Sequence, residues 1–313
     1  MRFLITGGAG FIGSHTAELL LSQGHTVTVL DNLSTVKKEN LAFDKKVEFI
    51  EGDVKDKATC ERAAKGQDGV IHLAAQVSVI HSLENPAHTH QVNIDGTLNL
   101  LEASRKAGAK SFVFASSCAV YGDNNQLPLM ETATLKPLSP YAVSKLAGEN
   151  YCGMYRQSHG LKTCVFRFFN IFGSRQDDTS PYSGVIAIFA KRLLASQGVT
   201  LFGDGNQTRD FLYVKDLVKV LTLAGSHPES FTGPAYNLCS GKQTTVNQLF
   251  AHLSKAAGKS VSTQFAPART GEILHSLGSY QLYGKVADSL GAPFQPTPLE
   301  EGLRETVRWY ASR

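Results

Sequence analysis

A tyrosine and a lysine four residues apart offer the clearest chemistry in this sequence. Ser139-Pro140 predicts a helix start, because serine caps helices and proline suits their first position, so Tyr141 and Lys145 fall on one helical face. An ammonium beside a phenol stabilises the phenolate and lowers the tyrosine pKa from about 10. The pair therefore predicts a base that works near neutral pH.

Two adjacent serines supply hydroxyl groups close to a predicted strand end. Ser116 and Ser117 follow the apolar run 112–115, which is typical of a buried strand. Ligands of open α/β sheets bind at the carboxyl ends of the strands. We therefore predict that Ser117, Tyr141 and Lys145 form one catalytic set.

A glycine-rich run near the start of the chain predicts a phosphate site. Gly8, Gly10 and Gly13 match G-x-G-x-x-G, whereas Gly7, Gly10 and Gly13 match a G-x-x-G-x-x-G variant, and spacing alone leaves both open. The run lies between a predicted strand at 3–6 and a predicted helix. Without side chains the backbone can approach a pyrophosphate, whose charge then meets free amides at the helix N-terminus.

Two aspartates follow the next predicted strands. Asp31 ends the strand at 26–30, where a carboxylate can accept both adenosine-ribose hydroxyls and repels a 2′-phosphate. This favours NAD over NADP. Lys37 and Lys38, which are close in sequence, argue the other way, because their positive charges would attract the 2′-phosphate of NADP. Asp53 is placed to meet the adenine edge, and a plain strand-end turn explains it equally well.

The order of elements predicts the fold class. Short apolar runs alternate with helical patterns through the first half, which is typical of a doubly wound parallel α/β sheet of the Rossmann type. We expect a dinucleotide-binding domain at 1–170 and a smaller C-terminal α/β domain at 171–313, with a segment near 206–240 as a candidate to return to the first. A capping box at Thr297 to Glu300 predicts a terminal helix. The predicted strands are 3–6, 26–30, 47–50, 70–73, 112–115 and 163–168.

Composition narrows the class of protein. Lys plus Arg exceed Asp plus Glu by 31 to 27, a net charge of +4 without a basic stripe, so we expect no nucleic-acid partner. No apolar run approaches the roughly 18 residues of a membrane span. The five cysteines form no C-x-x-C pair and the ten histidines show no ligand spacing. We expect a cytoplasmic protein without membrane or metal.

These motifs together resemble the extended short-chain dehydrogenase/reductase family, and above all its nucleotide-sugar epimerases. The resemblance spans nearly the whole chain. It is carried by the Gly7/Gly10/Gly13 turn, Asp31-Asn32-Leu33, Gly52-Asp53, His72-Leu73-Ala74-Ala75, Asn93, Ser116-Ser117, the Tyr141/Lys145 pair and Arg167-Phe168-Phe169-Asn170.

The resemblance implies roles for the catalytic set and a cofactor. Tyr141 is then the acid/base, Lys145 orients the nicotinamide ribose and tunes Tyr141, and Ser117 hydrogen-bonds the reacting sugar oxygen. The implied cofactor is NAD. Its expected contacts are Gly7, Gly10, Phe11, Ile12, Gly13, Asp31, Asn32, Asp53, Val54, Leu73, Ala74, Ala75, Asn93, Ser116, Tyr141, Lys145 and Phe168.

One local sequence separates the chemistries within this family. Nucleotide-sugar 4,6-dehydratases carry Thr-Asp-Glu where this chain has Ser117-Cys118-Ala119, and related decarboxylases keep the glutamate. Alanine has no ionisable group and a buried thiol is normally inert, so neither residue can supply the extra acid and base. This favours reversible oxidation without elimination, which is the epimerase pattern.

The second half carries the residues expected to bind a UDP-sugar. Two arginines suit a diphosphate, because each guanidinium can bind it bidentately. Ser276 stands where the epimerases gate the sugar pocket, and a small side chain leaves room for a 2-acetamido group. The expected substrate contacts are Gln76, Ser117, Asn170, Val185, Thr200, Phe202, Arg209, Arg269, Glu272 and Ser276.

The sequence therefore leads to one functional hypothesis with two alternatives. We expect a UDP-hexose 4-epimerase that interconverts UDP-glucose and UDP-galactose, and also the N-acetylhexosamine pair if Ser276 admits it, through a 4-keto intermediate with bound NAD. An NAD-dependent nucleotide-sugar reductase or dehydrogenase would share every motif. A non-catalytic dinucleotide sensor is disfavoured by the intact Ser117/Tyr141/Lys145 set. Resemblance to the family also implies a homodimer built on the helix after Asn93 and the helix at 139–159.

Overall fold

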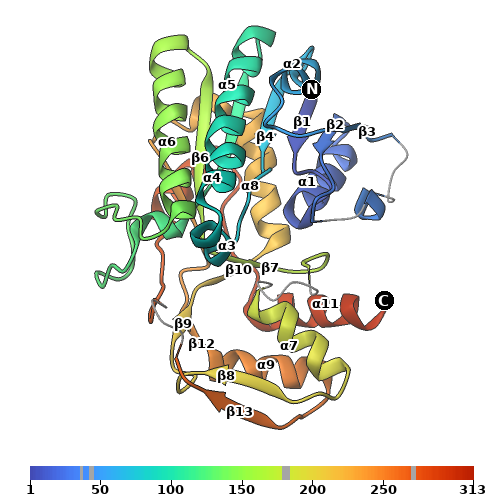
Figure 1. Cartoon of the computed structure of the whole chain (residues 1–313), viewed down its shortest axis with the longest axis vertical. Helices are drawn as coiled ribbons and strands as arrows, with labels where there is room; N and C mark the ends of the chain where they lie inside the picture. Colours follow the sequence, from blue (N-terminus) through green and yellow to red (C-terminus); the bar gives the residue numbers. More distant parts are fainter. Residues whose placement is uncertain (36–37, 42–45, 178–183, 269–272) are drawn as a thin grey trace. The chain divides into compact units, whose positions relative to one another are not determined.

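The chain divides into two compact units in a computed structural model (Figure 1), which describes residues 1–35, 38–41, 46–177, 184–268 and 273–313. The first unit comprises Met1–Gly122, Leu135–Phe168 and Val218–Tyr236, and the second comprises Asp123–Thr134, Phe169–Leu217 and Asn237–Arg313. A late segment of the chain thus returns to the first unit. The two-domain division at residue 170 stays a prediction.

The first unit contains most of the chain's strand residues, together with the helices that cover them. Its elements are β1 (Arg2–Thr6), α1 (Phe11–Ser22), β2 (Thr26–Asp31), η1 (Lys38–Leu41), β3 (Glu48–Glu51), α2 (Lys57–Ala64), β4 (Gly69–His72), α3 (Val79–Glu84), α4 (Pro86–His90), η2 (Gln91–Asp95), α5 (Gly96–Ala107), β5 (Ser111–Ser117), η3 (Cys118–Tyr121), α6 (Pro140–His159), β6 (Lys162–Phe168) and η4 (Pro228–Ser230). Two further elements, α8 (Val214–Ser226) and β11 (Tyr236–Leu238), straddle the division between the units.

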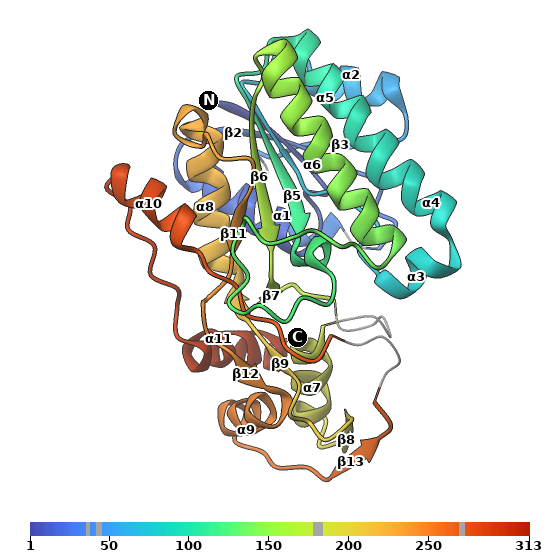
Figure 2. The ribbon, with the colours of Figure 1, turned by 90° about the vertical axis from the view of Figure 1, so that its left-hand side faces the viewer.

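A seven-stranded sheet in the order β11-β6-β5-β4-β1-β2-β3 forms the centre of the first unit. The pairings from β1 to β6 are parallel. Chain order reverses between β1 and β4, which is the switch point of a doubly wound sheet. Helices α2, α5 and α6 cover one face and α1 and α8 the other (Figure 2). The predicted Rossmann-type fold class is confirmed.

Burial explains why these strands read as continuous apolar runs. Every residue of β4 and β5 is buried, because helices cover both faces of the sheet. On one face Phe114 packs against Gly148 of α6, where a Cβ would lie 2.3 Å from the ring. On the other face Gly225 of α8 lies against Phe3. The sheet is therefore a rigid frame for residues at its carboxyl edge.

Local sequence sets the helices that carry the predicted site. Helix α6 begins where the Ser139 hydroxyl accepts from the Ala142 amide and Pro140 occupies the first turn, and it ends at Gly160 with φ +70°. Helix α1 begins after Gly10, whose position carries no side-chain cap. The amides of the first turn of α1 are consequently left without a side-chain partner.

The second unit combines short strand pairs with three packed helices. Helices α7, α9 and α11 contact one another. Strands β7 and β10 pair in parallel, as do β8 and β13, whereas β9 and β12 are antiparallel. The elements are β7 (Asn170–Phe172), α7 (Val185–Leu194), β8 (Val199–Phe202), β9 (Thr208–Arg209), β10 (Phe211–Tyr213), β12 (Thr244–Thr245), α9 (Val246–Ala257), β13 (Thr263–Ala266), α10 (Gln281–Ser289) and α11 (Leu299–Ala311).

The terminal helix differs in detail from its prediction. Helix α11 forms and buries Leu303, Val307 and Tyr310. The predicted capping box is wrong, since Pro298 occupies the cap position without a side-chain hydrogen bond. The Thr297 amide instead donates to Asp216, 2.7 Å away. None of the helices in the described ranges is long and apolar enough to cross a membrane.

Candidate active site

The glycine run after β1 forms a tight turn at the start of α1. Gly7 has φ +66°, and a Cβ there would lie 2.8 Å from the Ala74 amide nitrogen. A Cβ on Gly13 would lie 2.2 Å from the Gly7 carbonyl oxygen. Only glycine fits this close packing of turn, helix and β4 end. The uncapped amides of α1, at Phe11 and beyond, therefore face an open backbone cradle that suits the pyrophosphate of a dinucleotide.

Asp31 lies at the end of β2 beside this turn. Its carboxylate accepts from the Ala9 amide at 3.0 Å and from the Leu33 amide at 2.9 Å, so its position is fixed. Burial raises the pKa of Asp31, while both amides lower it. Each carboxylate oxygen keeps lone pairs for ribose hydroxyls. Next to it, the side-chain amide of Asn32 donates to the Asp53 carboxylate at 3.0 Å. This bond brings two of the predicted cofactor contacts together.

The remaining predicted cofactor residues lie around the same sheet edge. Leu73, Ala74 and Ala75 follow β4 at the switch point, and Phe168 ends β6. Val54 is buried against Gly96 of α5. These positions fit the predicted dinucleotide contacts, which stay a prediction residue by residue.

Asn93 has a bridging position inside the protein. It lies on the π-helical segment η2, and its amide donates to the Gln76 carbonyl at 3.0 Å and to the Ser144 hydroxyl at 2.9 Å. The side-chain oxygen of Asn93 accepts from the Gln76 backbone amide at 2.8 Å. Asn93 thus connects the loop after β4 to α6 at Ser144, the residue before Lys145.

The structure brings Ser117, Tyr141 and Lys145 together in the first unit. Ser117 is the last residue of β5, and its hydroxyl is close enough to the Tyr141 phenol to lower the tyrosine pKa. The Lys145 ammonium donates to the Ala115 carbonyl at 2.8 Å and lies 5.9 Å from the centroid of the Tyr141 ring. Strand β5 and helix α6 therefore present the three predicted catalytic residues as one cluster.

The direction of the tyrosine pKa shift differs from the sequence prediction. Burial raises the pKa of Tyr141 to about 12, and the hydrogen bond from Ser117 opposes this shift. Burial also lowers the pKa of Lys145 to about 8. Both groups leave water, and desolvation disfavours the charged form of each. In the protein alone, the pKa of Tyr141 is therefore shifted in the opposite direction to the one predicted.

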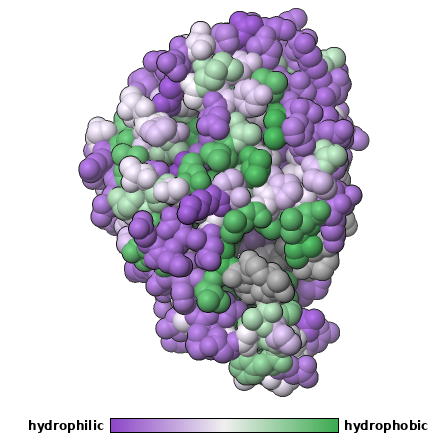
Figure 3. Space-filling view, turned by 60° about the vertical axis from the view of Figure 1, so that its left-hand side comes forward, coloured by the Kyte–Doolittle hydropathy of each residue, from purple (hydrophilic) through white to green (hydrophobic). Residues whose placement is uncertain are grey.

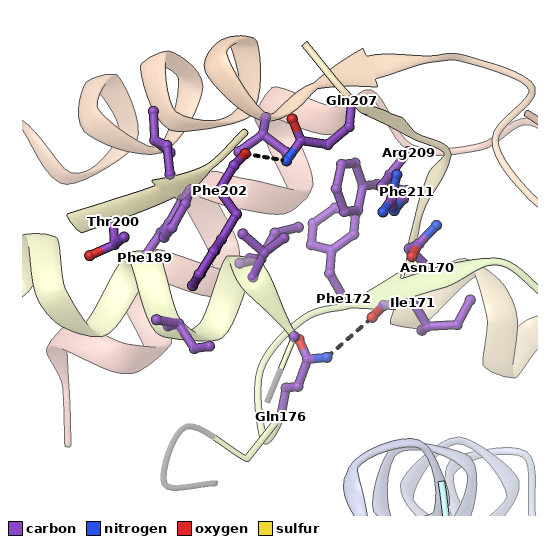
Figure 4. A pocket seen from close by; sticks show the side chains of 16 residues that line it. Asn170, Ile171, Phe172, Gln176, Phe189, Thr200, Phe202, Gln207, Arg209 and Phe211 are labelled. Carbon is purple, nitrogen blue, oxygen red and sulfur yellow. Dashed lines mark hydrogen bonds between the residues drawn. The ribbon is translucent and has the colours of Figure 1, made fainter. Parts of the chain in front are cut away.

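A pocket of about 380 Å³ in the second unit gathers half of the predicted substrate residues (Figure 4). The Gln207 side chain donates to the Phe202 carbonyl at 2.8 Å, and Gln176 donates to the Ile171 carbonyl at 3.3 Å. The predicted residues on its wall are Asn170, Val185, Thr200, Phe202 and Arg209. Sequence reasoning missed Phe172, Gln176, Phe189, Gln207 and Phe211, because single aromatic and amide residues carry no spacing signal.

Asp210, also missed from the sequence, organises this side of the second unit. Its buried carboxylate accepts from the Ser240 amide and hydroxyl, both at 2.7 Å, from the Gly241 amide at 3.0 Å and from the Gly278 amide at 3.2 Å. Its backbone carbonyl accepts from the amide and side chain of Asn170. Burial raises the pKa of Asp210, and these donors lower it. Asp210 therefore fixes its neighbour Arg209 at the pocket.

Three other predicted substrate residues are not among those that line this pocket. Gln76 and Ser117 belong to the first unit. Ser276 is buried in the second, and its amide donates to the Thr208 carbonyl on β9 at 3.2 Å. Arg269 and Glu272 lie outside the described residues. Within those described residues, no group of three or more His, Cys, Asp or Glu side chains could hold a metal ion.

Comparison with known proteins identifies the family of this chain and several relatives. The model of the NAD dependent epimerase/dehydratase family matches residues 3–239. A UDP-glucose 4-epimerase of Mycolicibacterium smegmatis is 37% identical over 319 residues, covering 100% of this chain and 99% of that protein.

Two solved structures match the whole chain. UDP-glucose 4-epimerase of Thermotoga maritima with UDP-glucose has a TM-score of 0.91 and 38% identity, covering 100% and 99% of the two chains. UDP-N-acetylglucosamine 4-epimerase of Methanobrevibacter ruminantium, in complex with UDP-N-acetylmuramic acid, has a TM-score of 0.92 and 38% identity, covering 99% and 98%.

Proposed function

The chain belongs to the NAD dependent epimerase/dehydratase family, and on that premise we propose that it is a UDP-hexose 4-epimerase that interconverts UDP-glucose and UDP-galactose. The observation that carries this proposal is the cluster of Ser117, Tyr141 and Lys145 at the sheet edge that also holds the glycine cradle. An acid/base and a dinucleotide site on one rigid edge are the two parts that reversible alcohol oxidation needs.

The protein's own residues handle the proton and hold the groups in place. The Tyr141 phenolate removes the proton from the sugar 4-hydroxyl and later returns it. The Ser117 hydroxyl holds the same oxygen, and Lys145 fixes the nicotinamide ribose. Bound NAD supplies a reversible two-electron acceptor for the sugar carbon, and its positive nicotinamide favours the phenolate that burial alone disfavours.

The pocket of the second unit supports a nucleotide anchor. Phe202 and Thr200 of β8 offer a ring face and a hydroxyl for a pyrimidine, and Arg209 offers a guanidinium for the diphosphate. Arg269 and Glu272 remain proposed contacts to the diphosphate and ribose. Contacts to the nucleotide hold the substrate without distinguishing the two configurations at carbon 4 of the sugar, so both epimers can react.

The site favours epimerisation over elimination. Cys118 and Ala119 follow Ser117 in the turn η3. Ala119 has no ionisable group, and Cys118, which is half-buried rather than buried, has a thiol where the dehydratases carry a carboxylate. Ser276 supports a second substrate pair, because its side chain is small and it stands at the position that gates the sugar pocket in the epimerases that the sequence resembles. We therefore include UDP-N-acetylglucosamine and UDP-N-acetylgalactosamine as substrates, in keeping with the Methanobrevibacter relative.

We further propose a homodimer that works in the cytosol. Val143 of α6 and Ile80 and Leu83 of α3 are exposed apolar side chains on two helices in contact. Figure 3, which brings the α6 side forward, shows hydrophobic side chains grouped among hydrophilic ones. A second copy would remove such a surface from water. All five cysteines are free, which suits a reducing compartment.

Turnover of defined UDP-hexoses tests the proposed reaction. Purified protein is incubated with UDP-glucose, UDP-galactose or either UDP-N-acetylhexosamine, and the products are separated by chromatography. We expect each epimer to yield the other with no net NADH. Release of one NADH per substrate would instead establish a dehydrogenase and overturn the epimerase proposal.

A variant that removes one hydroxyl tests the acid/base role. Tyr141→Phe should lower kcat by at least about 100-fold, the usual scale of general acid–base catalysis, while UDP binding measured by calorimetry stays within about twofold. Tyr283→Phe, which removes another buried phenol hydroxyl on α10, is the matched control and should keep kcat. Equal kcat in Tyr141→Phe and wild type would exclude Tyr141 as the acid/base.

A further inference from the structure

A buried polar network lies directly behind the catalytic cluster. Glu149 of α6 accepts from the Ser116 hydroxyl at 2.5 Å. It also forms a bidentate pair with Arg167 of β6, with Nε to Oε1 at 2.9 Å and Nη2 to Oε2 at 2.7 Å. The third nitrogen, Nη1, donates to the Tyr121 phenol oxygen at 2.9 Å. One ion pair thus connects a helix, two strands and the turn η3.

Register and helical spacing explain why these residues meet. Ser116 of β5 pairs with Arg167 of β6 in the sheet, so their side chains share the face covered by α6. Glu149 follows Lys145 by four residues and Tyr141 by eight, which places it on the same side of α6. Ser116 is therefore next to Ser117, and Glu149 lies one helical turn from Lys145 and two from Tyr141.

The residues of this network are buried, so their charged and polar groups lose contact with water. Ser116, Tyr121, Glu149 and Arg167 are all at most 8% exposed. Burial lowers the pKa of Arg167, but the hydrogen bonds and charge of Glu149 outweigh this effect and raise it. A buried ion pair is weak evidence for stability, because desolvation offsets the attraction. Its value lies in holding four segments in one arrangement, since loss of either Glu149 or Arg167 leaves the other charge buried and unpaired.

We propose that Glu149 and Arg167 are positioning residues, whose ion pair holds Ser117 and Tyr141 in the arrangement in which both reach the same sugar hydroxyl. This inference rests on the proposed epimerase function. Ser116 fixes the end of β5, so Ser117 projects from an anchored strand. Glu149 fixes α6 against that strand end, so Tyr141 keeps its hydrogen bond to Ser117. Arg167 extends the same restraint through Tyr121 to the turn after Ser117.

Loss of the ion pair should affect the chemical step more than binding. Glu149→Gln keeps the shape of the side chain and removes its charge. A displacement of about 1 Å between reacting groups can lower a rate about 100-fold, so we expect kcat to fall by about 10- to 100-fold. KM for the UDP-hexose should change by less than about threefold. Arg167→Lys, which keeps the charge but not the bidentate geometry, should be intermediate.

The pH profile provides a readout that loss of stability alone would not move. The Ser117 hydrogen bond lowers the pKa of Tyr141. Displacing Ser117 should therefore move the limb of kcat that reports the phenolate to higher pH in Glu149→Gln. The matched control is Thr163→Val, because the Thr163 hydroxyl donates to the Cys152 carbonyl at 2.9 Å and so joins the same strand and helix away from the cluster. Thr163→Val should keep both kcat and the pH profile.

Two outcomes would overturn the positioning role. One is kcat within twofold of wild type with an unshifted limb in Glu149→Gln. The other is an equal loss in Thr163→Val, which would indicate a general effect of weaker packing. If Glu149→Gln does not fold, Tyr121→Phe and Arg167→Lys provide the same comparison.

A crystal structure of Glu149→Gln separates this inference from the proposed function. We expect the distance between the Ser117 hydroxyl and the Tyr141 phenol oxygen to be longer in the variant than in the wild type, and to be unchanged in Thr163→Val. Failure of wild type to convert any UDP-hexose would refute the proposed function, and this distance would still decide the positioning role. An unchanged distance in Glu149→Gln would refute the positioning role even if the wild type is an active epimerase.

Discussion

Acid should weaken the fold through His72, which ends β4 at the switch point. This buried side chain hydrogen-bonds the Thr6 hydroxyl at 2.7 Å through Nδ1 and the Thr97 hydroxyl at 2.9 Å through Nε2. Burial, and secondarily the charge of Lys145, lowers the pKa of His72 from 6.5 to about 3. A buried neutral imidazole therefore connects β1, β4 and α5.

The size of the effect follows from proton linkage. Between pH 6.5 and about 3 the unfolded chain binds a proton at His72 and the folded chain does not, so stability falls as the pH falls through this window. Each pKa unit corresponds to about 1.4 kcal/mol of unfolding free energy. The contribution of His72 is fully present above pH 6.5 and is lost towards pH 3, so the total loss is at most about 5 kcal/mol.

Urea unfolding at several pH values within this window measures the effect. His72→Gln lacks a titratable ring, so its free energy of unfolding should fall less steeply with acid than that of wild type, even though its stability near neutral pH is lower. His88→Gln, at an exposed position of α4, is the matched control and should follow wild type. Parallel curves for wild type and His72→Gln would refute this reasoning.

Four further changes have defined outcomes. Asp210→Asn should lower the free energy of unfolding by about 2–6 kcal/mol, because the buried amides of Gly241 and Gly278 lose their shared carboxylate oxygen as acceptor. The affinity for UDP, measured by calorimetry, should fall as well. A loss of unfolding free energy below about 1 kcal/mol would contradict this. Gly13→Ala should lower the free energy of unfolding by about 1–3 kcal/mol, because the new Cβ would clash with the Gly7 carbonyl oxygen. It should also reduce the amount of bound NAD measured by absorbance, and a normal NAD content would argue against the glycine cradle. Asp31→Asn should raise NADP affinity at least about tenfold in a fluorescence titration, and unchanged affinity would exclude its role in cofactor choice. Val143→Asp on α6 should halve the mass measured by light scattering, whereas an equal mass in wild type and variant would place any interface elsewhere.

Periodicity and punctuation were sufficient to predict six of the seven strands of the sheet, but not β11. The predicted strand at 3–6 is β1 (Arg2–Thr6), and the predicted strand at 112–115 lies within β5 (Ser111–Ser117). Helices covering both faces make such strands continuously apolar, and glycine or proline marks their limits. The second unit gave weaker signals, because strands of two or three residues, such as β9 and β12, are too short to show a period.

Contacts between distant residues explain what the sequence could not indicate. Asp210 looks like any surface aspartate until Ser240 and Gly278 are brought to it by the fold. The direction of the Tyr141 pKa shift likewise depends on burial, which the spacing to Lys145 does not report. Motif spacing therefore located the catalytic cluster, but its electrostatics required the packed protein.

The late return of the chain to the first unit has a consequence for how this protein is made. Helix α8 covers Phe3 through Gly225, and β11 lies beside β6 at the edge of the sheet. Both emerge from the ribosome only after residues 123–134 and 169–213 of the second unit have been synthesised. Until then α1 alone covers one face of the nascent sheet and β6 is an open edge strand, and both features favour aggregation. A fragment ending before α8 would keep that exposed surface permanently, so the first unit cannot be expressed by cutting the chain once.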